Sequence, residues 1–451
     1  MFSKILIANR GEIAVRVIRA CKEMGISTVA VFSEADKDAL HVSLADESFC
    51  IGKALPKDSY LNINNIITAA LVSKAEAIHP GYGFLAENAE FARICGENKI
   101  IFIGPKSETI SSMGDKDMAR KTMEKAGVPI IPGCELVESV EHAKKEAERI
   151  GFPLLIKARA GGGGRGIRLI NTPDELENNY HSAVSEAQNA FNDGSVYMEK
   201  YLTEVKHIEM QVLADNFGNV VCLGERDCSM QRKNQKLIEE SPSPFVSDEL
   251  RQAMISMAIK ASKAVDYRGA GTIECLCDKD GNFYFMEMNT RLQVEHPVTE
   301  MVTGIDLVKW QIRIAANVAL DFSQDEIKFD GHAIECRVCA ENPYMGFRPS
   351  AGKITMLHTP GGPWVRFDSA IYHGYFIPPF YDSMIGKLIV AARTRNEAIR
   401  KMKAALCELI IEGVEHNSDL QMDILACDEF DSGLHTTASL TRLLSDKGLN
   451  L

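Results

Sequence analysis

Apolar and amphipathic stretches alternate along the first hundred residues of the chain. Residues 4–9 (KILIAN) and 27–33 (STVAVFS) are short apolar runs of the kind that form buried strands. Between them, residues 11–25 repeat apolar side chains at the spacing of a helix that buries one face. The alternation continues to residues 100–105 (IIFIGP). This pattern predicts an α/β domain with a doubly wound sheet at residues 1–113.

The most glycine-rich segment is KARAGGGGRGIR at residues 157–168. Its spacing Gly161-x-Gly163-x-x-Gly166 is that of a dinucleotide-binding loop, which must lead from a strand into a helix. Here a second apolar run, IRLI at residues 167–170, follows the glycines. The segment is therefore predicted to be the turn of a β-hairpin. It also lacks the Lys-Ser/Thr pair of a Walker A loop.

A glycine-rich hairpin has a use of its own, because backbone N–H groups without side chains can close over phosphates. We interpret the segment as a phosphate-binding lid, and a tight turn without a ligand is the alternative. The next helix is expected to begin at Pro173, with Thr172 as its N-cap and Glu175 completing a capping box.

Polar and apolar residues alternate after Phe285, with Thr290 as the one interruption. In an extended chain, one set of polar side chains would project to the same side; the set is Glu287, Asn289, Arg291, Gln293 and Glu295. This stretch is long for a single strand, so the chain is predicted to leave the sheet near Asn289. A salt-bridged surface strand is the alternative interpretation.

The oxygen atoms of Glu287 and Asn289 suit Mg²⁺, which takes few protein carboxylates and completes its shell with water and nucleotide phosphates. Glu274, in the preceding strand across the DKDGN turn, can supply a third oxygen. Arg291 follows as a fixed cation. Glu295 is close enough in sequence to share the site and to act as a base.

A second polar segment, ERDCSMQRKNQKLIEES at residues 225–241, concentrates positive charge in an otherwise acidic chain. Its cations are Arg226, Arg232, Lys233 and Lys236. Such a cluster can bind a small anion. A solvated charged loop fits the same residues equally well.

The composition excludes several classes of protein. The formal net charge of −12 argues against general nucleic-acid binding, which needs a basic surface. No apolar run approaches the ~20 residues that span a bilayer. The N-terminal apolar run is too short for the core of a signal peptide. We therefore expect a cytoplasmic protein that binds neither nucleic acid nor membrane.

The twelve cysteines are interpreted as buried structural residues and not as metal ligands or members of a disulfide framework. Cys336-x-x-Cys339 lies in an alternating run that predicts a strand, where the two thiols would point to opposite faces. Cys275 and Cys277 share a face and fit small core positions.

Two breaks divide the chain. Pro129, Pro132 and Gly133 predict a linker into a second structural unit. A change of composition near Asp330 predicts that the C-terminal segment packs separately.

Motifs along nearly the whole chain resemble those of the biotin carboxylases, in the ATP-grasp superfamily. They include HPGYGFLAEN, MGDK, GGGGRG, MEKYL, ERDCSMQR, RGAGTIE, EMNTRLQVEHPVTE, HAIECR and PPFYDSMIGKLI. The resemblance implies a doubly wound pre-ATP-grasp domain at residues 1–113 and an ATP-grasp domain at 114–330. A mobile lid would occupy about residues 131–203, and a C-terminal biotin carboxylase domain residues 331–451.

The resemblance also assigns residues to ATP, metal and substrates. ATP would be bound by Lys116, Lys157, Gly163, Gly164, Glu199, Lys200, Tyr201, Leu202, His207, Asn234, Glu274 and Glu287. Mg²⁺ or Mn²⁺ would be held by Glu274, Glu287 and Asn289. Bicarbonate and biotin would contact Lys236, Arg291, Gln293, Val294 and Arg337. The catalytic residues would be Arg291, Glu295 and Lys236.

Within this set, Glu295 would activate bicarbonate, Arg291 would stabilise the biotin enolate and Arg337 would meet biotin. Arg337 lies two residues after Glu335 in the same predicted strand, so the two side chains would point to the same polar face. His207 would contact the ribose. From the residues alone, His207 is equally a polar-face partner of Glu209.

Two positions depart from the family pattern. Asn234 stands where many relatives have a histidine, which removes a group that could be cationic. Arg159 replaces a small residue beside the glycine run, where it could add a phosphate contact or restrict the lid.

The implied reaction is the ATP- and bicarbonate-dependent carboxylation of biotin on a separate biotin carboxyl carrier protein, via carboxyphosphate. Lys401 and Lys403 lie in a helical pattern that does not match a biotinylation segment. The resemblance favours the biotin carboxylase subunit of acetyl-CoA carboxylase in fatty acid synthesis, working with carboxyltransferase subunits. A split pyruvate carboxylase or another acyl-CoA carboxylase is the alternative. A homodimer is implied, with Arg19, Glu23 and Arg366 at interface positions.

Three rival classes remain to be weighed. Another ATP-grasp ligase would attack its activated carboxylate with an amine, which the TRLQVEHPVTE run and Arg337 argue against. A non-catalytic nucleotide-binding protein would be expected to lack a metal ligand or the base. A nicotinamide-dependent dehydrogenase conflicts with the hairpin placement of the glycines.

Overall fold

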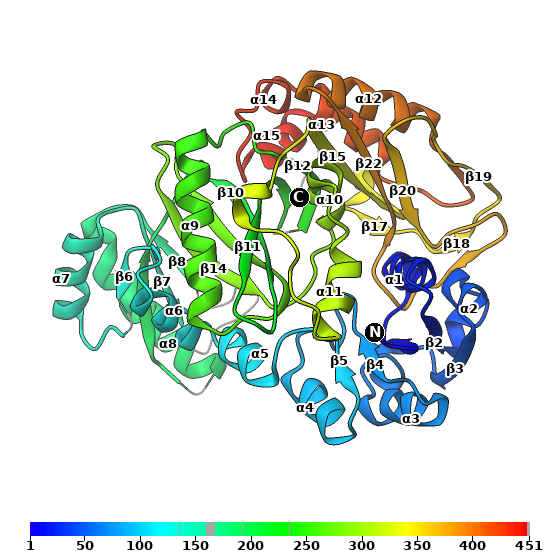
Figure 1. Ribbon diagram of the computed structural model, residues 1–451. Coiled ribbons are helices and arrows are strands. Elements are labelled where there is room, and N and C mark those ends of the chain that lie inside the picture. Colours follow the sequence, from blue (N-terminus) through cyan, green and yellow to red (C-terminus); the bar gives the residue numbers. More distant parts are fainter. Residues whose placement is uncertain (135, 159–166, 192, 234, 449–451) are drawn as a thin grey trace. The chain divides into compact units, whose positions relative to one another are not determined.

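The computed structural model describes residues 1–134, 136–158, 167–191, 193–233 and 235–448 (Figure 1). It is a mixed α/β structure with two compact units. One unit comprises residues 1–128, 206–276 and 287–451, and the other comprises residues 129–205 and 277–286. The linker predicted at Pro129 and Pro132 therefore lies at the start of the second unit. The domain boundaries at 113 and 330 stay predictions.

The N-terminal segment forms a parallel sheet in the order β3-β2-β1-β4-β5. The chain moves from the central strand β1 outward to one edge and then to the other, so the predicted doubly wound topology is confirmed. Ile5 and Ile7 enter one buried core and Leu6 enters another, because successive side chains of β1 point to opposite covered faces. The strands are β1 (Lys4–Ile7), β2 (Ser27–Ser33), β3 (Glu47–Gly52), β4 (Ala77–His79) and β5 (Ile101–Phe102).

The helices of this segment bury the apolar faces that the sequence predicted. In α1 the side chains of Ile13, Val17 and Ile18 are buried against the sheet core. Figure 1 shows these elements in blue and cyan. The helices are α1 (Gly11–Glu23), α2 (Leu40–Leu44), α3 (Ile63–Ser73), α4 (Ala89–Glu97), α5 (Ser107–Gly114) and α6 (Lys116–Lys125).

The largest sheet has eight strands in the order β14-β13-β10-β11-β12-β15-β22-β20. It joins the middle of the chain to the C-terminal segment, as the change from green to orange strands in Figure 1 shows. The strands are β10 (Lys206–Ala214), β11 (Val220–Arg232), β12 (Gln235–Ser241), β13 (Gly269–Cys277), β14 (Phe283–Asn289), β15 (His332–Cys339), β20 (Val365–Ser369) and β22 (Met384–Ala392).

The prediction that the segment after Asp330 packs separately is wrong. Strand β15 pairs directly with β12, and Ile334 shares one buried core with Ile238 and Leu388. The physical reason is the edge of β12, whose backbone N–H and C=O groups would otherwise lack partners. Sequence composition carries no signal for this pairing.

Helices and short strands complete the first unit. The helices are α9 (Asp248–Ala264), α10 (His296–Thr303), α11 (Leu307–Ala315), α12 (Arg395–Glu408), α13 (Ser418–Ala426), α14 (Asp428–Asp431) and α15 (Ser439–Asp446). Three two-stranded pairs join β16 (Glu341–Asn342) with β17 (Arg348–Pro349), β18 (Gly352–Lys353) with β21 (Phe376–Ile377), and β19 (Met356–His358) with β23 (Ile410–Glu412). Lys401 and Lys403 lie in α12, as the helical pattern predicted.

The second unit has an antiparallel sheet in the order β6-β9-β7-β8. Strands β7 and β8 pair with Lys157 opposite Ile167, which confirms the predicted hairpin. The glycine run at its turn lies outside the described residues. The elements of this unit are β6 (Gly133–Cys134), β7 (Leu154–Ala158), β8 (Ile167–Ile170), β9 (Val196–Lys200), α7 (Val140–Ile150) and α8 (Leu176–Phe191).

The capping box predicted at Thr172 is wrong. Pro173 does occupy the first helical position, but residues Pro173–Glu175 form a 3₁₀ turn before α8 begins at Leu176. Within the described residues the Thr172 side chain makes no capping hydrogen bond. The Glu175 carboxylate instead accepts a hydrogen bond from the backbone N–H of Asn171 at 2.9 Å. In the tighter 3₁₀ turn, the Glu175 carboxylate meets the backbone N–H of Asn171 and not that of Thr172.

The cysteine interpretation is confirmed for the two pairs that it named. Cys336 and Cys339 are buried in β15, three residues apart and therefore on opposite faces. Cys275 and Cys277 are buried in β13, and none of these four described cysteines forms a disulfide.

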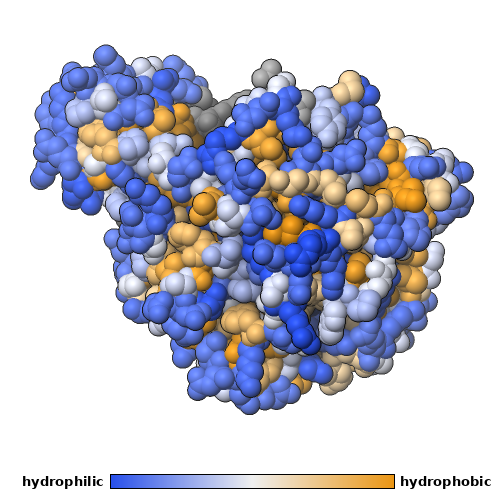
Figure 2. Space-filling model, turned by 90° about the horizontal axis from the view of Figure 1, so that it is seen from above, coloured by the Kyte–Doolittle hydropathy of each residue, from blue (hydrophilic) through white to orange (hydrophobic). Residues whose placement is uncertain are grey.

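In the part of the chain that the structure describes, no helix is both long enough and apolar enough to span a bilayer. On the face drawn in Figure 2, hydrophobic residues form separate patches among hydrophilic ones. Trp364 and Leu434 are among the exposed large apolar side chains, at 68% and 74% exposure.

Candidate active site

Lys236 lies at the centre of a buried ionic cluster in the first unit. Its ammonium Nζ donates to Oε2 of Glu209 at 2.6 Å, to Oε1 of Glu274 at 3.0 Å and to Oε1 of Glu295 at 2.6 Å. Burial alone would lower the pKa of Lys236, but Cys228 and these carboxylates hold that pKa well above its usual value. The side chain is therefore a fixed cation in a site with three acidic neighbours.

Glu295 is fully buried at the N-cap position of α10. Its second oxygen accepts a hydrogen bond from Nη2 of Arg337 at 2.9 Å. Burial raises the pKa of a carboxyl group, but Lys236, Arg337 and Arg226 outweigh it and hold the pKa of Glu295 well below the usual value. Glu295 is thus ionised at neutral pH, which is the form that a base needs.

The alternating polar residues converge on Glu274 in β13. Its Oε1 accepts from Nδ2 of Asn289 at 3.0 Å and from Nε2 of Gln293 at 2.8 Å. Nη2 of Arg291 donates to Oδ1 of Asn289 at 3.0 Å, and its Nη1 donates to Oε1 of Gln293 at 2.8 Å. The predicted convergence is therefore confirmed for these residues. Since Asn289, Gln293 and Glu295 are buried, the surface-strand alternative is wrong.

Strand β14 ends at Asn289, where the sequence predicted that the chain leaves the sheet. Beyond that point the backbone turns towards α10, so strict alternation no longer decides where the side chains point. Hydrogen bonds to Glu274 hold Asn289 and Gln293 on the same side despite the turn.

The carboxylates near the predicted metal ligands repel one another. Burial and the charge of Glu274 raise the pKa of Glu287, against the opposing charge of Lys116. A bound divalent cation would relieve this repulsion. Carboxylate and amide oxygens from Glu274, Glu287 and Asn289 are the donors that Mg²⁺ prefers. The residues present therefore fit the predicted metal.

His207 contacts a predicted metal ligand, and its contact with the ribose stays a prediction. Its Nε2 lies 3.0 Å from Oε2 of Glu274, and the ring is buried in β10. The alternative prediction had paired His207 with Glu209, but Glu209 turns to Lys236 and Arg226.

The positive segment at residues 225–241 is not a solvated loop. It forms the hairpin of β11 and β12, and Arg226 is fully buried with its Nε 2.5 Å from Oε1 of Glu209. Arg226 also donates to Gln211, Thr299 and Thr272. Glu209 is therefore held between Arg226 and Lys236, with one carboxylate oxygen on each. The guanidinium of Arg232 lies over the ring of Phe347 at 3.9 Å from the centroid.

Arg337 in β15 connects the cluster to the C-terminal strands. Its Nε donates to Oε1 of Glu239 at 2.6 Å while Nη2 reaches Glu295. The polar-facing parity predicted for Arg337 is confirmed by these contacts. Lys387, its register partner in β22, is fully buried and donates to the carbonyl of Val294 at 2.7 Å.

Comparisons with known proteins decide the family. Three family models match: the biotin carboxylase N-terminal domain at residues 1–110, the carbamoyl-phosphate synthase L chain ATP-binding domain at 115–323, and the biotin carboxylase C-terminal domain at 335–442. Biotin carboxylase 1 of Bacillus subtilis is 56% identical over 98% of both chains.

The chain belongs to the biotin carboxylase family. It is an ATP-dependent ligase with biotin carboxylase activity. The rival classes (an amine-using ligase, a non-catalytic nucleotide-binding protein and a dehydrogenase) are thereby set aside.

Solved structures agree with this assignment. The biotin carboxylase of Campylobacter jejuni is 52% identical, with a TM-score of 0.91 and coverage of 98% of this chain and 99% of the other. The biotin carboxylase domain dimer of 2-oxoglutarate carboxylase from Hydrogenobacter thermophilus, solved with MgADP and bicarbonate, is 52% identical with a TM-score of 0.89 over 98% of both chains. The three-domain biotin carboxylase fold with an ATP-grasp domain is thus confirmed.

Within the second unit, the residues that family resemblance assigns to ATP are partly paired with one another. Nζ of Lys157 lies 2.7 Å from Oε2 of Glu199, which β7 and β9 bring opposite each other. Nζ of Lys200 donates to the carbonyl of Phe152 at 2.7 Å. The backbone N–H of Tyr201 donates to the carbonyl of Pro153 at 3.0 Å, and Leu202 follows half-buried.

The remaining predicted residues are Lys116 and four positions outside the described residues. Lys116 stands at the first turn of α6 and is exposed. Gly163, Gly164, Asn234 and Arg159 lie outside the described residues.

Two of the three residues predicted at the biotin carboxylase dimer interface form ion pairs within the chain. Arg366 binds Glu300 at 2.7 Å and Asp368 at 2.6 Å, and Glu23 binds Lys309 at 2.5 Å. Arg19 is exposed on α1.

Sequence reasoning missed several buried members of the site. Glu209, Glu239 and Lys387 all contact predicted residues. The exposed residue Glu87 was missed as well, and its Oε2 accepts from Nε of Arg291 at 2.8 Å. The charged residues in otherwise apolar strands were the available signal, because a charge that is buried needs a partner.

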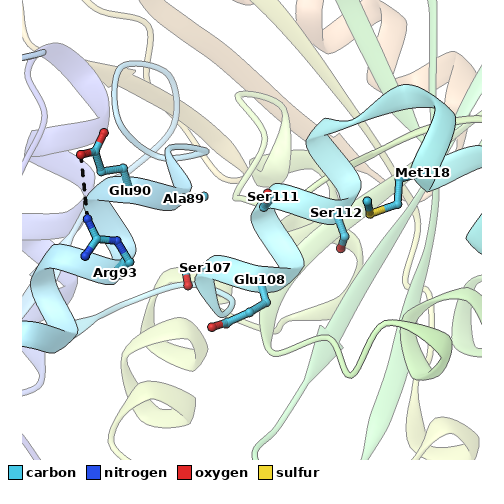
Figure 3. A pocket seen from close by; sticks show the side chains of 8 residues that line it. All are labelled: Ala89, Glu90, Arg93, Ser107, Glu108, Ser111, Ser112 and Met118. Atoms are coloured by element: carbon cyan, nitrogen blue, oxygen red, sulfur yellow. Dashed lines mark ion pairs between the residues drawn. The ribbon is translucent and has the colours of Figure 1, made fainter.

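A shallow groove of about 580 Å³ lies along α4 and α5 and reaches the start of α6 (Figure 3). Glu90 and Arg93 form an ion pair of 3.9 Å at one side of it, and Ser111, Ser112 and Met118 line the other. None of its lining residues is among the predicted site residues, so we assign it no role.

Proposed function

We propose that this chain carboxylates biotin on a separate carrier protein, using ATP, Mg²⁺ and bicarbonate through carboxyphosphate. The observation that supports this most directly is the buried contact between Lys236 and Glu295, with Arg337 on the other side of the carboxylate. A fixed cation beside an ionised, water-excluded base suits a small anion that must lose a proton.

Glu295 is proposed as the base that takes the proton from bicarbonate. Its neighbouring cations keep it ionised but also weaken its basicity. When bicarbonate shares those cations, their hold on Glu295 weakens and its basicity rises. The deprotonated oxygen then attacks the γ-phosphate, ADP leaves, and carboxyphosphate forms.

Lys236 and Arg291 are proposed to bind the anion, with Gln293 and the backbone of Val294. Arg291 already donates to Gln293 and to the carbonyl of Leu292, so its guanidinium is held in one orientation. Carboxyphosphate breaks down to CO₂ and phosphate, and this phosphate takes the N1′ proton of biotin. Arg291 stabilises the resulting enolate, and Arg337 contacts biotin.

Glu274, Glu287 and Asn289 are proposed to hold Mg²⁺ or Mn²⁺, which would neutralise charge on the transferred phosphate. For the nucleotide we propose contacts from Lys116, Lys157, Gly163, Gly164, Glu199, Lys200, Tyr201, Leu202, His207 and Asn234, together with Glu274 and Glu287. The two structures named above as relatives support the choice of ligands, since one holds MgADP and bicarbonate and the other is an ATP complex.

The final carboxyl acceptor is proposed to be acetyl-CoA, so that the chain serves fatty acid synthesis in the cytoplasm with a carrier protein and carboxyltransferase subunits. The relatives of Bacillus subtilis and Nostoc, each 56% identical, are named biotin carboxylases without an acceptor, so the acetyl-CoA proposal rests on the family resemblance. The second candidate is a keto-acid carboxylase. The small subunit of 2-oxoglutarate carboxylase is 52% identical, and a pyruvate carboxylase subunit from Methanothermobacter thermautotrophicus is 54% identical. A homodimer is proposed from the relative solved as a dimer.

Two experiments test these proposals. Release of phosphate from ATP should depend on both bicarbonate and free biotin, and release that ignores biotin would contradict the reaction. For the acceptor, the tagged chain is used to capture its biotinylated carrier and transferase. The captured complex is then assayed with acetyl-CoA, pyruvate and 2-oxoglutarate. Carboxylation of a keto acid in place of acetyl-CoA would overturn the acetyl-CoA assignment and leave the biotin carboxylation intact.

A further inference from the structure

Two buried glutamates lie directly opposite each other behind Arg337. Glu239 in β12 and Glu335 in β15 are register partners in an antiparallel pair, and both side chains are 0% exposed. Opposed residues of such a pair point to the same face, with Cβ atoms about 4.5–5.5 Å apart. At this spacing two glutamate carboxyl groups can reach each other.

Hydrogen bonding around this pair is incomplete for two ionised carboxylates. Oε1 of Glu239 accepts from Nε of Arg337 at 2.6 Å. Among the described residues, no hydrogen-bond partner reaches Oε2 of Glu239 or either oxygen of Glu335. Three buried, unpaired oxygens on two adjacent negative charges would strongly destabilise the folded protein. A single proton between the two groups removes one charge and supplies a donor.

The surrounding cations are already engaged. Lys387 faces Glu335 from β22, but its Nζ contacts Oε1 of Glu12 at 3.2 Å and donates to the carbonyl of Val294. Arg337 is shared between Glu239 and Glu295. The other charged or titratable groups that act on the pair include Lys236 of β12, Cys336 of β15, Glu295 at the start of α10 and Tyr82 after β4.

The acid–base properties of the pair point the same way. Burial raises the pKa of Glu335 well above its usual value, and Glu239 adds to this increase. Burial likewise raises the pKa of Glu239 to about 7, with Glu295 adding to the increase. The first proton is therefore retained at neutral pH.

We propose that Glu239 and Glu335 share one proton and act as a positioning pair that orients Arg337 towards Glu295. The proton on Glu335 is donated to Oε2 of Glu239, so Glu239 presents one negative charge to Nε of Arg337. The guanidinium then keeps Nη2 on Glu295. If both glutamates were ionised, the doubled charge would draw Arg337 away from the base. This inference rests on the proposed roles of Arg337 and Glu295.

The first test examines the shared proton without reference to activity. Infrared spectra of the full-length protein at pH 7.5 should contain a carbonyl band of a protonated carboxylic acid that is lost in Glu335→Gln. Glu397→Gln, which changes an exposed glutamate of α12, should leave that band unchanged. Identical acid bands in the wild type and Glu335→Gln would overturn the shared proton.

The pH dependence of the free energy of unfolding is a second test of the shared proton. A group whose pKa is raised by folding loses stabilisation as the pH rises towards that pKa. Glu335→Gln carries no titrating group, so its free energy of unfolding relative to the wild type should increase with pH. A difference that does not change between pH 6 and pH 9 would contradict the raised pKa of the pair.

The third test addresses positioning. Glu335→Gln keeps a neutral donor, so it should retain activity near neutral pH and extend it further into alkaline pH than the wild type. Glu239→Gln removes the charge that holds Nε of Arg337 and should lower kcat/KM for biotin about 10²-fold. A wild-type pH profile in Glu335→Gln, or unchanged kinetics in Glu239→Gln, would overturn positioning. The infrared test does not depend on enzyme activity. It therefore tests the shared proton even if the positioning role or the proposed reaction is wrong.

Discussion

Nζ of Lys236 lies 2.6 Å from Oε1 of Glu295, and both side chains are buried. The two residues come from β12 and from the start of α10, which are 59 positions apart in the chain. Because the same ammonium also contacts Glu209 and Glu274, it links the proposed base to the proposed metal ligands.

Glu295→Gln removes the base but keeps the size of the side chain and an acceptor for Lys236. We expect bicarbonate-dependent turnover to fall by about 10²–10⁴-fold, which is the usual contribution of a positioned base. ATP affinity should be nearly unchanged. Steady-state kinetics and calorimetric titration with nucleotide measure the two effects. Turnover equal to that of the surface variant Glu397→Gln would remove Glu295 from its assigned role.

Lys236→Met leaves Glu209, Glu274 and Glu295 without their shared cation. Breaking a buried pair in this way typically costs about 3–5 kcal/mol. The pKa values of the carboxyl groups that Lys236 lowers should rise, so the loss should be largest at neutral and alkaline pH and smaller in acid, where protonation removes the unpaired charges. Denaturant unfolding across pH checks this. Lys263→Met, at an exposed position of α9, is the control. A deficit that grew as the pH fell would contradict the prediction.

Glu287→Gln tests the metal site. The change removes one charged oxygen ligand while leaving Glu274 and Asn289 in place. We expect the Mg²⁺ concentration at half-maximal activity to rise about 10–100-fold. Nucleotide binding measured without metal should not weaken, since the carboxylate that is removed would then only repel phosphate. An unchanged Mg²⁺ requirement would exclude Glu287 as a ligand. Glu249→Gln, at the exposed start of α9, serves for comparison.

Glu240→Gln tests acid stability in a region away from the proposed base. Burial would raise the pKa of Glu240, but His332 and Arg395 outweigh it and lower the pKa to about 2. A carboxyl group whose pKa is lowered by folding stabilises the protein above its unfolded pKa of about 4.5, and this stabilisation disappears as the pH falls to about 2.

The Glu240→Gln variant should therefore be less stable than the wild type at pH 7, by about 3 kcal/mol. The difference should shrink progressively below pH 4.5. Chemical unfolding at a series of pH values measures it. A difference that stays constant down to pH 2.5 would show that the carboxylate contributes nothing through its charge.

Much of the fold could be predicted because it depends on local patterns. The strands at residues 4–9 and 27–33, the helix between them and the β7–β8 hairpin follow from apolar spacing and the position of glycines. The end of β14 at Asn289 followed from the usual length of a strand. The capping box at Thr172 failed, since a 3₁₀ turn and an α-helix begin with nearly the same residues.

The candidate site was predicted less completely. The alternation from Glu287 to Glu295 indicated a polar face, and the hydrogen bonds of Asn289 and Gln293 to Glu274 confirm that these residues converge. The sequence did not predict that Glu239 faces Glu335. The register between two strands that are far apart in the chain cannot be derived from the residues of either strand alone.

What the sequence determined by itself is the local chemistry: which runs become strands, which glycines make a hairpin, and which motifs place the chain among the biotin carboxylases. The tertiary structure alone decided that β15 closes the edge of β12, and with it that Arg337 meets Glu295 and that Glu239 faces Glu335. The reason is physical. Burial and pairing of charges depend on long-range packing, in which segments far apart in the chain satisfy each other's backbone and side-chain groups.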